Sequence, residues 1–267
     1  MCKPFIISNL FYDTNFYTVD NTFTNFEPLY FVLFSLLFPK KQLMPTNVPQ
    51  KPYWWWYCTA SSKHAIQPPY AYGIVTQVVN SDALYYCYTA IEKEVNSFGF
   101  KKSFSFQAMT YAQHKKNNEL VFRFLNFFKP IQITEIGTGT GITTAYLSAY
   151  CSTIPVYKIS VDKSLFPTII SPIYCTDIKT WQQYPPSSFL WINTDNTLST
   201  EQLLYLLQKM PDHSCIMVDA IYTNATNSAL WSVLKESPLV NCSMSFYHTG
   251  IAIFKTGLQK QHYEVRF

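Results

Sequence analysis

The chain of 267 residues is long enough for one large domain, or for a domain with an extension. Apolar residues make up 48% of the chain, which is ample for a globular core, and charged residues only 13%. Lys and Arg number 20 and Asp and Glu 16, and this net charge of +4 forms no basic stripe that would indicate nucleic-acid binding. The seven scattered cysteines include no C-x-x-C pair. They predict neither a zinc site nor a disulfide framework and favour a reducing, cytoplasmic setting.

The first 43 residues differ in composition from the rest of the chain. They are rich in Phe, Tyr, Asn and Thr without a clear period, and Met44 follows them. We therefore interpret residues 1–43 as a divergent N-terminal extension, compatible with disorder. Their apolar run, residues 29–38, is too short for a membrane span, which needs about 20 residues. A membrane-surface or partner-binding segment built on this run remains an alternative.

Residues 44–116 are predicted to form an N-terminal helical region. Three adjacent tryptophans, residues 54–56, cannot share one face of a helix or strand, so only one or two of them are expected to pack inward. The Pro68–Pro69 pair leads into a helical pattern that extends to Val79, and residues 81–95 predict a second helix. Residues 101–113 indicate only a loop or a short helix.

From residue 117 onward, the pattern is typical of an α/β domain (residues 117–267). An amphipathic helix is predicted over residues 117–128 and a buried strand over residues 131–136. Further strands are predicted over residues 156–161, 169–175, 188–194 and 214–218, and further helices over residues 200–210 and 227–236. Residues 242–247 and 250–255 predict a closing antiparallel pair. Only six residues separate Asp162 from the third of these strands, fewer than a parallel crossover normally needs, so the crossover helix is lost or the strand is shifted.

The first strand runs into the most informative stretch of the chain. It contains an acid, Glu135, and leads to three glycines at alternate positions, Gly137, Gly139 and Gly141, after which residues 142–150 predict a helix. Glycines allow a ligand to approach the backbone, and a helix N-terminus offers free N–H groups. The plainer alternative is a tight turn with no ligand, but the chain has only 7 glycines and three of them fall here.

Acids follow several of the other predicted strands. Asp162 follows the second strand, where a carboxylate can bind both hydroxyls of a ribose, and Asp177 follows the third, within reach of an adenine amino group. Asp195 and Asp219 follow the fourth and fifth strands, at the edge where doubly wound sheets bind ligands. For each of these acids, a capping or structural role is the alternative.

The G-x-G-x-G spacing, with an acid two residues before it, resembles motif I of class I S-adenosylmethionine-dependent methyltransferases. The order of the elements also resembles that family, and more narrowly small methyltransferases of Bacteroidetes-type bacteria. The matching segments are KHAIQPPYAYGIVTQVV, LNFFKPIQITEIGTGTGITTAYLS, IMVDAIY, TGIAIFK and KQHYEVRF. The resemblance implies a Rossmann-like doubly wound sheet, mostly parallel with a C-terminal antiparallel hairpin and preceded by N-terminal helices. It implies S-adenosyl-L-methionine as cofactor, lined by Glu135, Gly137, Thr138, Gly139 and Gly141, with Asp162 on its ribose.

The sequence departs from this family at three points. Gln67–Pro68–Pro69 stands where the family has His-Ser-Pro, the crossover after Asp162 is short, and Asp219–Ala220 replaces two acids. Because a divalent ion needs more oxygen ligands than these acids supply, no metal is predicted.

Three functional hypotheses follow. The first is methyl transfer to a small-molecule acceptor, most simply O-methylation, with Asp195 as the base and then Asp219 and Tyr222 as candidates; the loop histidines His213 and His248 are weaker ones. The second is a degenerate methyltransferase fold that binds without catalysis. The third, a nicotinamide oxidoreductase, is disfavoured by the glycine spacing. No nucleic acid and no membrane span are expected, and the acceptor and oligomeric state are not indicated.

Overall fold

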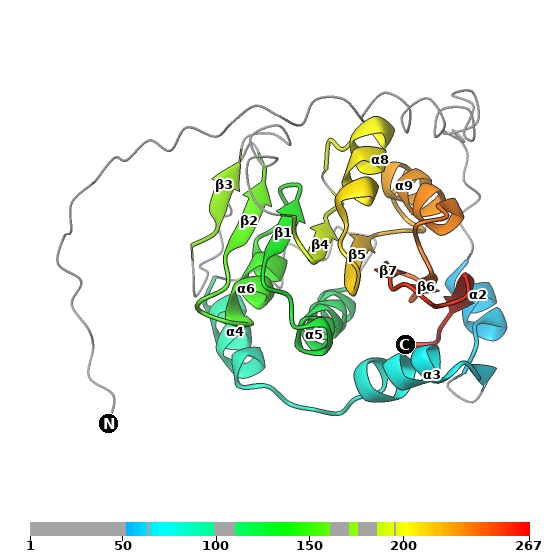
Figure 1. The fold of residues 1–267 in the computed structure, drawn as a ribbon. Helices are drawn as coiled ribbons and strands as arrows, with labels where there is room; N and C mark the ends of the chain where they lie inside the picture. The colour runs from blue at the N-terminus through cyan, green and yellow to red at the C-terminus, as the bar shows by residue number, and fades with distance from the viewer. Residues whose placement is uncertain (1–51, 63–64, 99–109, 161–170, 176–185, 195) are drawn as a thin grey trace, which may run out of the picture. The chain divides into compact units, whose positions relative to one another are not determined.

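The computed structural model describes residues 52–62, 65–98, 110–160, 171–175, 186–194 and 196–267 (Figure 1). The chain from Leu43 to Phe267 forms one compact unit. The predictions for residues 1–43 and for Asp162, Asp177 and Asp195 lie outside the described residues.

A single eight-stranded sheet organises the described part of the chain. Its strands are β1 (Ile133–Ile136), β2 (Val156–Ile159), β3 (Ile173–Cys175), β4 (Phe189–Ile192), β5 (Ser214–Asp219), β6 (Cys242–Ser245), β7 (Thr249–Phe254) and β8 (Gln261–Glu264). They lie in the order β3-β2-β1-β4-β5-β7-β6-β8 (Figure 1). Strands β1 to β5 are parallel, β7 is antiparallel to β5 and β6, and β8 is parallel to β6. The predicted fold class, a doubly wound and mostly parallel sheet with a C-terminal antiparallel hairpin, is confirmed.

The central strands form because short, mostly apolar runs are buried on both faces of the sheet, as parallel strands require. All four residues of β1, β2 and β4 are buried. The register places Ile136 opposite Ile159 on one side and Ile192 on the other, so β1, β2 and β4 end at the same level.

Helices cover both faces of this sheet. They are α2 (Tyr53–Thr59), α3 (Pro69–Ile74), the π-helix η2 (Val75–Val79), α4 (Tyr86–Ser97), α5 (Tyr111–Phe128), α6 (Ile142–Ala149), α8 (Thr200–Lys209) and α9 (Ala225–Glu236). Residues of α3, η2 and α5 share one core cluster with one side of the sheet, and α8 and α9 share a second cluster with the other side (Figure 1). A third cluster joins α4 and α6 to Phe122 of α5.

Two helix starts differ from the sequence-based prediction. Helix α5 begins six residues earlier than predicted, because the Thr110 side chain accepts a hydrogen bond from the Gln113 N–H and the Gln113 side chain binds the Thr110 N–H in return. Helix α4 begins at Tyr86 rather than at residue 81. The segment between η2 and α4 is thereby left non-helical, and it forms one wall of a cavity described below.

Three strand predictions also need correction. Strand β1 begins at Ile133, and Ile131, expected in the buried strand, is 79% exposed. Strand β3 begins at Ile173, so residues 160–172 connect it to β2, which is long enough for a parallel crossover. The sequence QHYE, for which no strand was predicted, forms β8 at the edge of the sheet.

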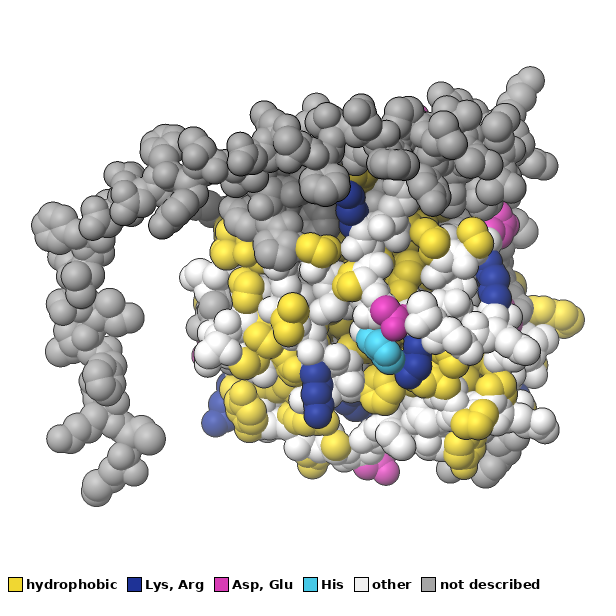
Figure 2. All heavy atoms as spheres, in the orientation of Figure 1, with side chains coloured by type: hydrophobic (Ala, Val, Ile, Leu, Met, Phe, Trp, Pro, Cys, Tyr) yellow, Lys and Arg dark blue, Asp and Glu magenta, His cyan; other side chains and the backbone are white. Residues whose placement is uncertain are grey.

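The three adjacent tryptophans lie in α2, and one of them packs inward as expected. The Trp56 side chain is fully buried, whereas Trp54 and Trp55 are 64% and 50% exposed. On the face in Figure 2, apolar, charged and uncharged side chains are mixed, and the Lys and Arg side chains lie at separate places. None of the described helices is both long and apolar enough to cross a membrane.

Candidate functional site

The order of the strands in the sheet places the candidate site at the carboxyl ends of β1 and β4. Strand β2 lies on one side of β1 and β4 on the other, so the chain reverses its direction of winding between β1 and β4. In doubly wound folds, ligands bind beyond the carboxyl ends of the strands at such a reversal. Here the glycine loop, residues 137–141, follows β1, and Asn193 follows β4.

The glycine loop has a backbone that other residues would adopt only under strain. The φ angles of Gly137, Gly139 and Gly141 are 102°, 57° and 89°. A Cβ on Gly139 would also lie 3.1 Å from the side-chain amide atoms of Asn193. The loop therefore depends on glycine both for its conformation and for its close approach to the end of β4.

The same loop begins helix α6 without a side-chain cap. Gly141 is the N-cap residue and offers no acceptor, and the Thr140 hydroxyl accepts a long hydrogen bond of 3.4 Å from the N–H of Ile142. Since the first N–H groups of a helix have no partner within the helix, the start of α6 presents donors and a positive dipole end beyond the carboxyl end of β1.

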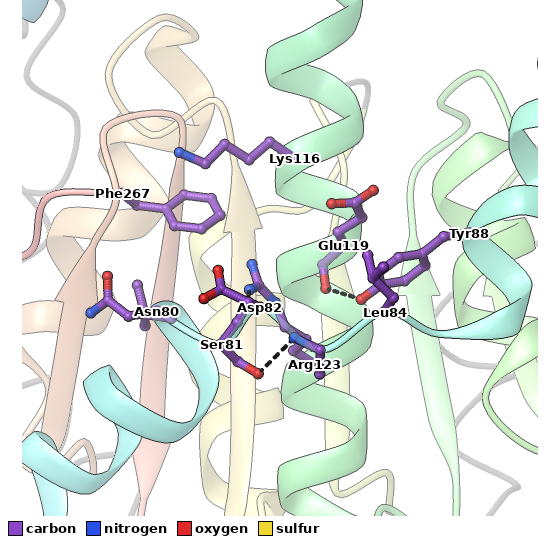
Figure 3. Close-up of a pocket in the computed structure, with 11 residues that line it drawn as sticks. Asn80, Ser81, Asp82, Leu84, Tyr88, Lys116, Glu119, Arg123 and Phe267 are labelled. Atoms are coloured by element: carbon purple, nitrogen blue, oxygen red, sulfur yellow. Dashed lines mark hydrogen bonds between the residues drawn. The ribbon is translucent and has the colours of Figure 1, made fainter.

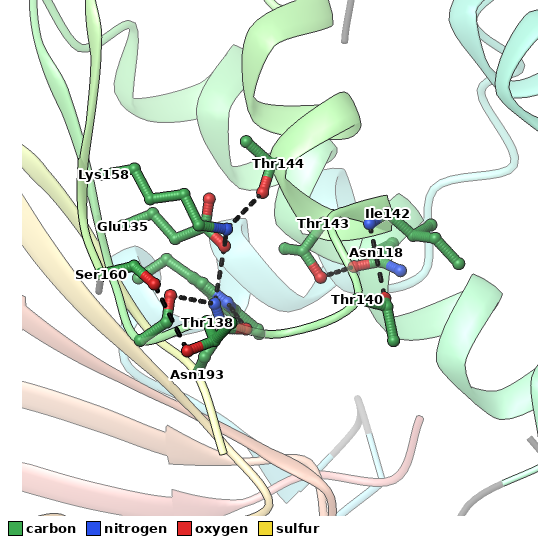
Figure 4. A network of polar contacts seen from close by, with 12 residues as sticks. Asn118, Glu135, Thr138, Thr140, Ile142, Thr143, Thr144, Lys158, Ser160 and Asn193 are labelled. Carbon is green, nitrogen blue, oxygen red and sulfur yellow. Dashed lines mark hydrogen bonds and ion pairs between the residues drawn. The ribbon is translucent and has the colours of Figure 1, made fainter. Parts of the chain in front are cut away.

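A buried polar network lies directly beneath the loop (Figure 4). Lys158 of β2 donates to Glu135 Oε1 and to the Thr144 hydroxyl, each over 2.9 Å. Asn193 donates to the same carboxylate oxygen over 2.6 Å, and its own side-chain oxygen accepts from Trp191 Nε1 over 2.8 Å. Glu135 and Lys158 form an ion pair, and both side chains are almost fully buried. The network fixes the Glu135 carboxylate with one oxygen toward Lys158 and Asn193.

The other oxygen of this carboxylate has no partner. Glu135 Oε2 is buried and makes no hydrogen bond. Burying a charged acceptor without a partner is costly, and an orphaned carboxylate oxygen beneath a glycine loop is a place where a ligand donor or cation would be stabilised. The role predicted for Glu135 in lining a cofactor stays a prediction, and its pairing with Lys158 was not predicted.

Two further hydrogen bonds position the loop (Figure 4). The Thr143 hydroxyl donates to Asn118 Oδ1 of α5 over 2.8 Å, and the Ser160 hydroxyl donates to that of Thr138 over 3.3 Å. The start of α6 is therefore attached to α5, and the loop itself is attached through Thr138 to the end of β2. Thr138, predicted as a lining residue, is half-buried at this point.

Side-chain amides hold the ends of β4 and β5 together. Asn227 of α9 donates to the main-chain oxygens of Asn193, over 3.2 Å, and of Asp219, over 2.6 Å. The Thr194 hydroxyl donates to Asp219 Oδ2 over 3.0 Å. The Asp219 carboxylate is thereby oriented at the predicted edge, and it is half-buried.

Tyr222, the third candidate base, lies just beyond β5. Its hydroxyl donates to Glu264 Oε1 over 3.2 Å, and its ring is 5.8 Å from the Tyr247 ring. Burial raises the pKa of Tyr222 to about 12. The phenol is therefore protonated at neutral pH and can donate a hydrogen bond but not accept a proton.

The two histidines considered from the sequence lie beyond opposite ends of strand β5. His213 immediately precedes β5, at the edge remote from the glycine loop, and is bound to Asp212 over 3.4 Å. His248 lies between β6 and β7, and the next residue, Thr249, is paired with Asp219. Of the two, only His248 lies at the candidate edge.

The His248 side chain is buried, and neither ring nitrogen has a hydrogen-bond partner. Burial lowers its pKa to about 4, so the ring is neutral at neutral pH. The neighbouring hydroxyl of Thr249 is also buried without a partner. Unpartnered polar atoms thus accumulate around the turn between β6 and β7.

The sequence analysis missed Lys158, Asn193 and Asn227 as parts of the site. A lysine in the middle of an otherwise apolar strand was the available signal for Lys158, because such a residue needs a buried partner. Within the described ranges, no three His, Cys, Asp or Glu side chains gather as metal ligands would.

No family model matches the chain, and no curated protein matches it. Among solved structures, it is similar to the O-methyltransferase TomG from Streptomyces achromogenes, in complex with SAM, with 11% identity over 68% of this chain and 95% of that one and a TM-score of 0.46. It is also similar to an SAH-bound O-methyltransferase from Bacillus cereus, with 14% identity over 68% and 95% and a TM-score of 0.44. An SAH-bound methyltransferase from Podospora anserina gives 13% identity over 71% and 98%, with a TM-score of 0.44. At these identities and TM-scores, the likeness supports no conclusion about the chemistry of this chain.

Proposed function

We propose that the chain binds S-adenosyl-L-methionine in the crevice between β1 and β4 and transfers a methyl group to a small-molecule acceptor, most simply at oxygen. The observation that supports this best is the pairing of an uncapped helix start with the orphaned oxygen of Glu135 beneath a glycine loop. The cofactor carries both anionic and cationic groups, so a site that offers N–H donors and an unsatisfied carboxylate oxygen suits it.

The residues present fit this cofactor on one side of the crevice. Gly137, Gly139 and Gly141 would let the backbone approach it closely, Thr138 would line it, and Glu135 would offer its free oxygen. The N–H groups of Gly139 and Gly141 would face it, because the Gly137 N–H already donates to the main-chain oxygen of Ile159 over 2.9 Å. Asp162 and Asp177 remain the residues that we propose for the ribose and the adenine. When bound, the cofactor supplies an activated methyl group on a sulfonium.

The protein must then hold the acceptor and take up its proton. Of the candidate bases, Asp219 has the described geometry that suits this role, because Thr194 orients its carboxylate at the edge of the sheet. Tyr222 is protonated at neutral pH, and its hydroxyl would donate to an acceptor oxygen only after releasing its hydrogen bond to Glu264. Asp195 remains a proposed base on its position after β4. The described cysteines are free thiols, which suits the cytoplasm that we propose.

A non-catalytic binding protein is the second candidate, and one observation favours it. The Glu135 carboxylate is already neutralised by Lys158 over 2.9 Å, which weakens its attraction for a cationic ligand. A protein that only binds would tolerate this weaker attraction, whereas a methyltransferase must also align the methyl group.

Calorimetric titration of S-adenosylmethionine and S-adenosylhomocysteine into the full chain tests binding. We expect micromolar affinity that Gly139→Arg abolishes and that Gly257→Arg retains. Gly257 is the matched control, because it also has a positive φ of 80° but has open space around it. If the wild-type chain folds and binds neither compound, the proposal is wrong.

Transfer of a labelled methyl group to a panel of phenols and carboxylic acids then separates the two candidates. Product formation that Asp219→Asn abolishes, with cofactor affinity retained, supports catalysis. Tight binding with no transfer to any acceptor in the panel supports the non-catalytic alternative.

A further inference from the structure

A cavity of about 530 Å³ lies outside the crevice between β1 and β4 (Figure 3). Its walls are the segment between η2 and α4, one side of α5, and Phe267. None of the residues around it belongs to the glycine loop or to the strand ends described above. Its size is in the range of small-molecule sites.

Two cations of α5 face this cavity, and among the described residues neither forms an ion pair. Lys116 and Arg123 are seven residues apart, which places them on the same side of the helix. Lys116 Nζ is 4.3 Å from the centre of the Phe267 ring, and the Arg123 guanidinium carbon is 5.6 Å from it. No described carboxylate lies within ion-pair distance of either cation.

The guanidinium of Arg123 is also incompletely hydrogen-bonded. Its Nη1 donates to the main-chain oxygen of Ser81, which holds the wall segment against α5 (Figure 3). Its Nε is buried and has no acceptor. An unpartnered charged donor beside a cavity is costly unless a ligand supplies the acceptor.

Burial lowers the pKa of both cations, and the charge of Arg123 lowers the pKa of Lys116 further. The two positive charges therefore repel each other in a partly desolvated place. An anion between them would relieve this repulsion and would accept from Arg123 Nε.

Two acids limit the charge that such an anion can carry. Glu119 lies on α5 between the two cations, and its carboxylate is 4.0 Å from Lys115 Nζ. Asp82 lies on the exposed wall segment. Because both acids repel an anion, a single negative charge suits the cavity better than a phosphate dianion.

Apolar side chains complete the walls. They include Val79, Tyr88, the Phe267 ring and Leu84, and the Leu84 side chain is 91% exposed. An apolar body next to the charged group would cover Leu84 and contact the Phe267 ring.

We propose that this cavity binds a small organic monocarboxylate, with its carboxylate between Lys116 and Arg123 and its apolar body against Phe267 and Leu84. The site is separate from the crevice at the glycine loop, so this proposal does not depend on the proposed methyl transfer.

Phenylacetate titrated into the full chain, followed by ligand-observed NMR and calorimetry, tests the proposal. We expect saturable binding at about 1 mM or tighter, weakened at least about tenfold by Lys116→Gln and by Arg123→Gln. Lys115→Gln, the neighbouring lysine that is paired with Glu92 over 3.3 Å, is the matched control and should retain affinity. Because Lys116 is exposed, its replacement tests the site even if Arg123→Gln disturbs the wall segment.

Two further probes define the class of ligand. Neutral phenylacetamide should bind at least about tenfold more weakly than phenylacetate, and inorganic phosphate should not displace phenylacetate. The proposal is overturned if phenylacetate does not bind, if the amide binds equally well, if phosphate competes, or if Lys115→Gln weakens binding as much as Lys116→Gln.

Discussion

Replacing Lys158 with methionine removes the cation from the buried network beneath the glycine loop. The ammonium donates to Glu135 Oε1 and to the Thr144 hydroxyl, both over 2.9 Å, and its side chain is 0% exposed. Methionine keeps an unbranched side chain of similar length, so the loss of packing is small. The carboxylate of Glu135 then stays buried with only the Asn193 amide as a donor.

Breaking a buried ion pair by removing one partner costs about 3–5 kcal/mol, because the other charge is left uncompensated. We expect Lys158→Met to lower the free energy of unfolding by about this amount, and Glu135→Gln to have a similar effect. The double variant should cost much less than the sum of the two single variants, since neither charge then remains.

Urea unfolding of the wild type, both single variants and the double variant gives this cycle. Lys115→Met is the control, because Lys115 is partly exposed beside Glu92 and its loss should cost no more than about 1 kcal/mol. Equal losses for Lys158→Met and Lys115→Met, or strictly additive single variants, would refute the role assigned to the buried pair.

Three other predictions follow from single contacts. A Cβ on Gly250 would lie 2.8 Å from the Trp231 ring, so Gly250→Ala should lower the free energy of unfolding in urea by about 1–3 kcal/mol. Gly73→Ala is the control, because Gly73 lies in a helix with open space around it, and it should raise the free energy of unfolding by up to about 1 kcal/mol. Burial lowers the pKa of His248 from its ordinary 6.5 to about 4, so the ring binds a proton more readily in the unfolded chain. The free energy of unfolding should therefore be highest above pH 6.5 and fall by up to about 3 kcal/mol toward pH 4. In urea unfolding at a series of pH values, His248→Gln should reduce this dependence on pH. In calorimetry, Gly139→Ala should weaken cofactor binding more than Glu135→Gln does.

The sequence was sufficient to predict the parallel strands and their order along the chain. The central strands are mostly apolar and short enough to be buried on both faces, although β1 contains Glu135 and β2 contains Lys158. The glycines after Ile136 mark where β1 turns into α6. The capping residues Thr110 and Gln113 were also present as a signal, and their T-x-x-Q spacing predicts the true start of α5. That start was missed because the segment before it is polar and aromatic without a period.

Other features depend on contacts that no local pattern contains. Strand β8 has no alternation of apolar and polar residues, and it forms because β6 offers a free edge. Glu135 and Lys158 lie directly opposite each other on β1 and β2. Their pairing requires both the strand order and the register, and a shift of one residue would turn the lysine to the other face of the sheet.

The buried Glu135–Lys158 pair also affects which groups can bind a ligand in the crevice. Glu135 Oε1 already accepts from Lys158 and Asn193, so the pair as a whole is close to neutral and offers a cation only the remaining oxygen. The glycine loop, by contrast, brings backbone donors to the crevice, and at Gly139 a Cβ would lie 3.1 Å from the Asn193 side chain. Because a Cβ on Gly139 disturbs both this backbone and the approach to it, geometry outweighs charge in the proposed site. That difference is the physical reason for expecting Gly139→Ala to be the more damaging change.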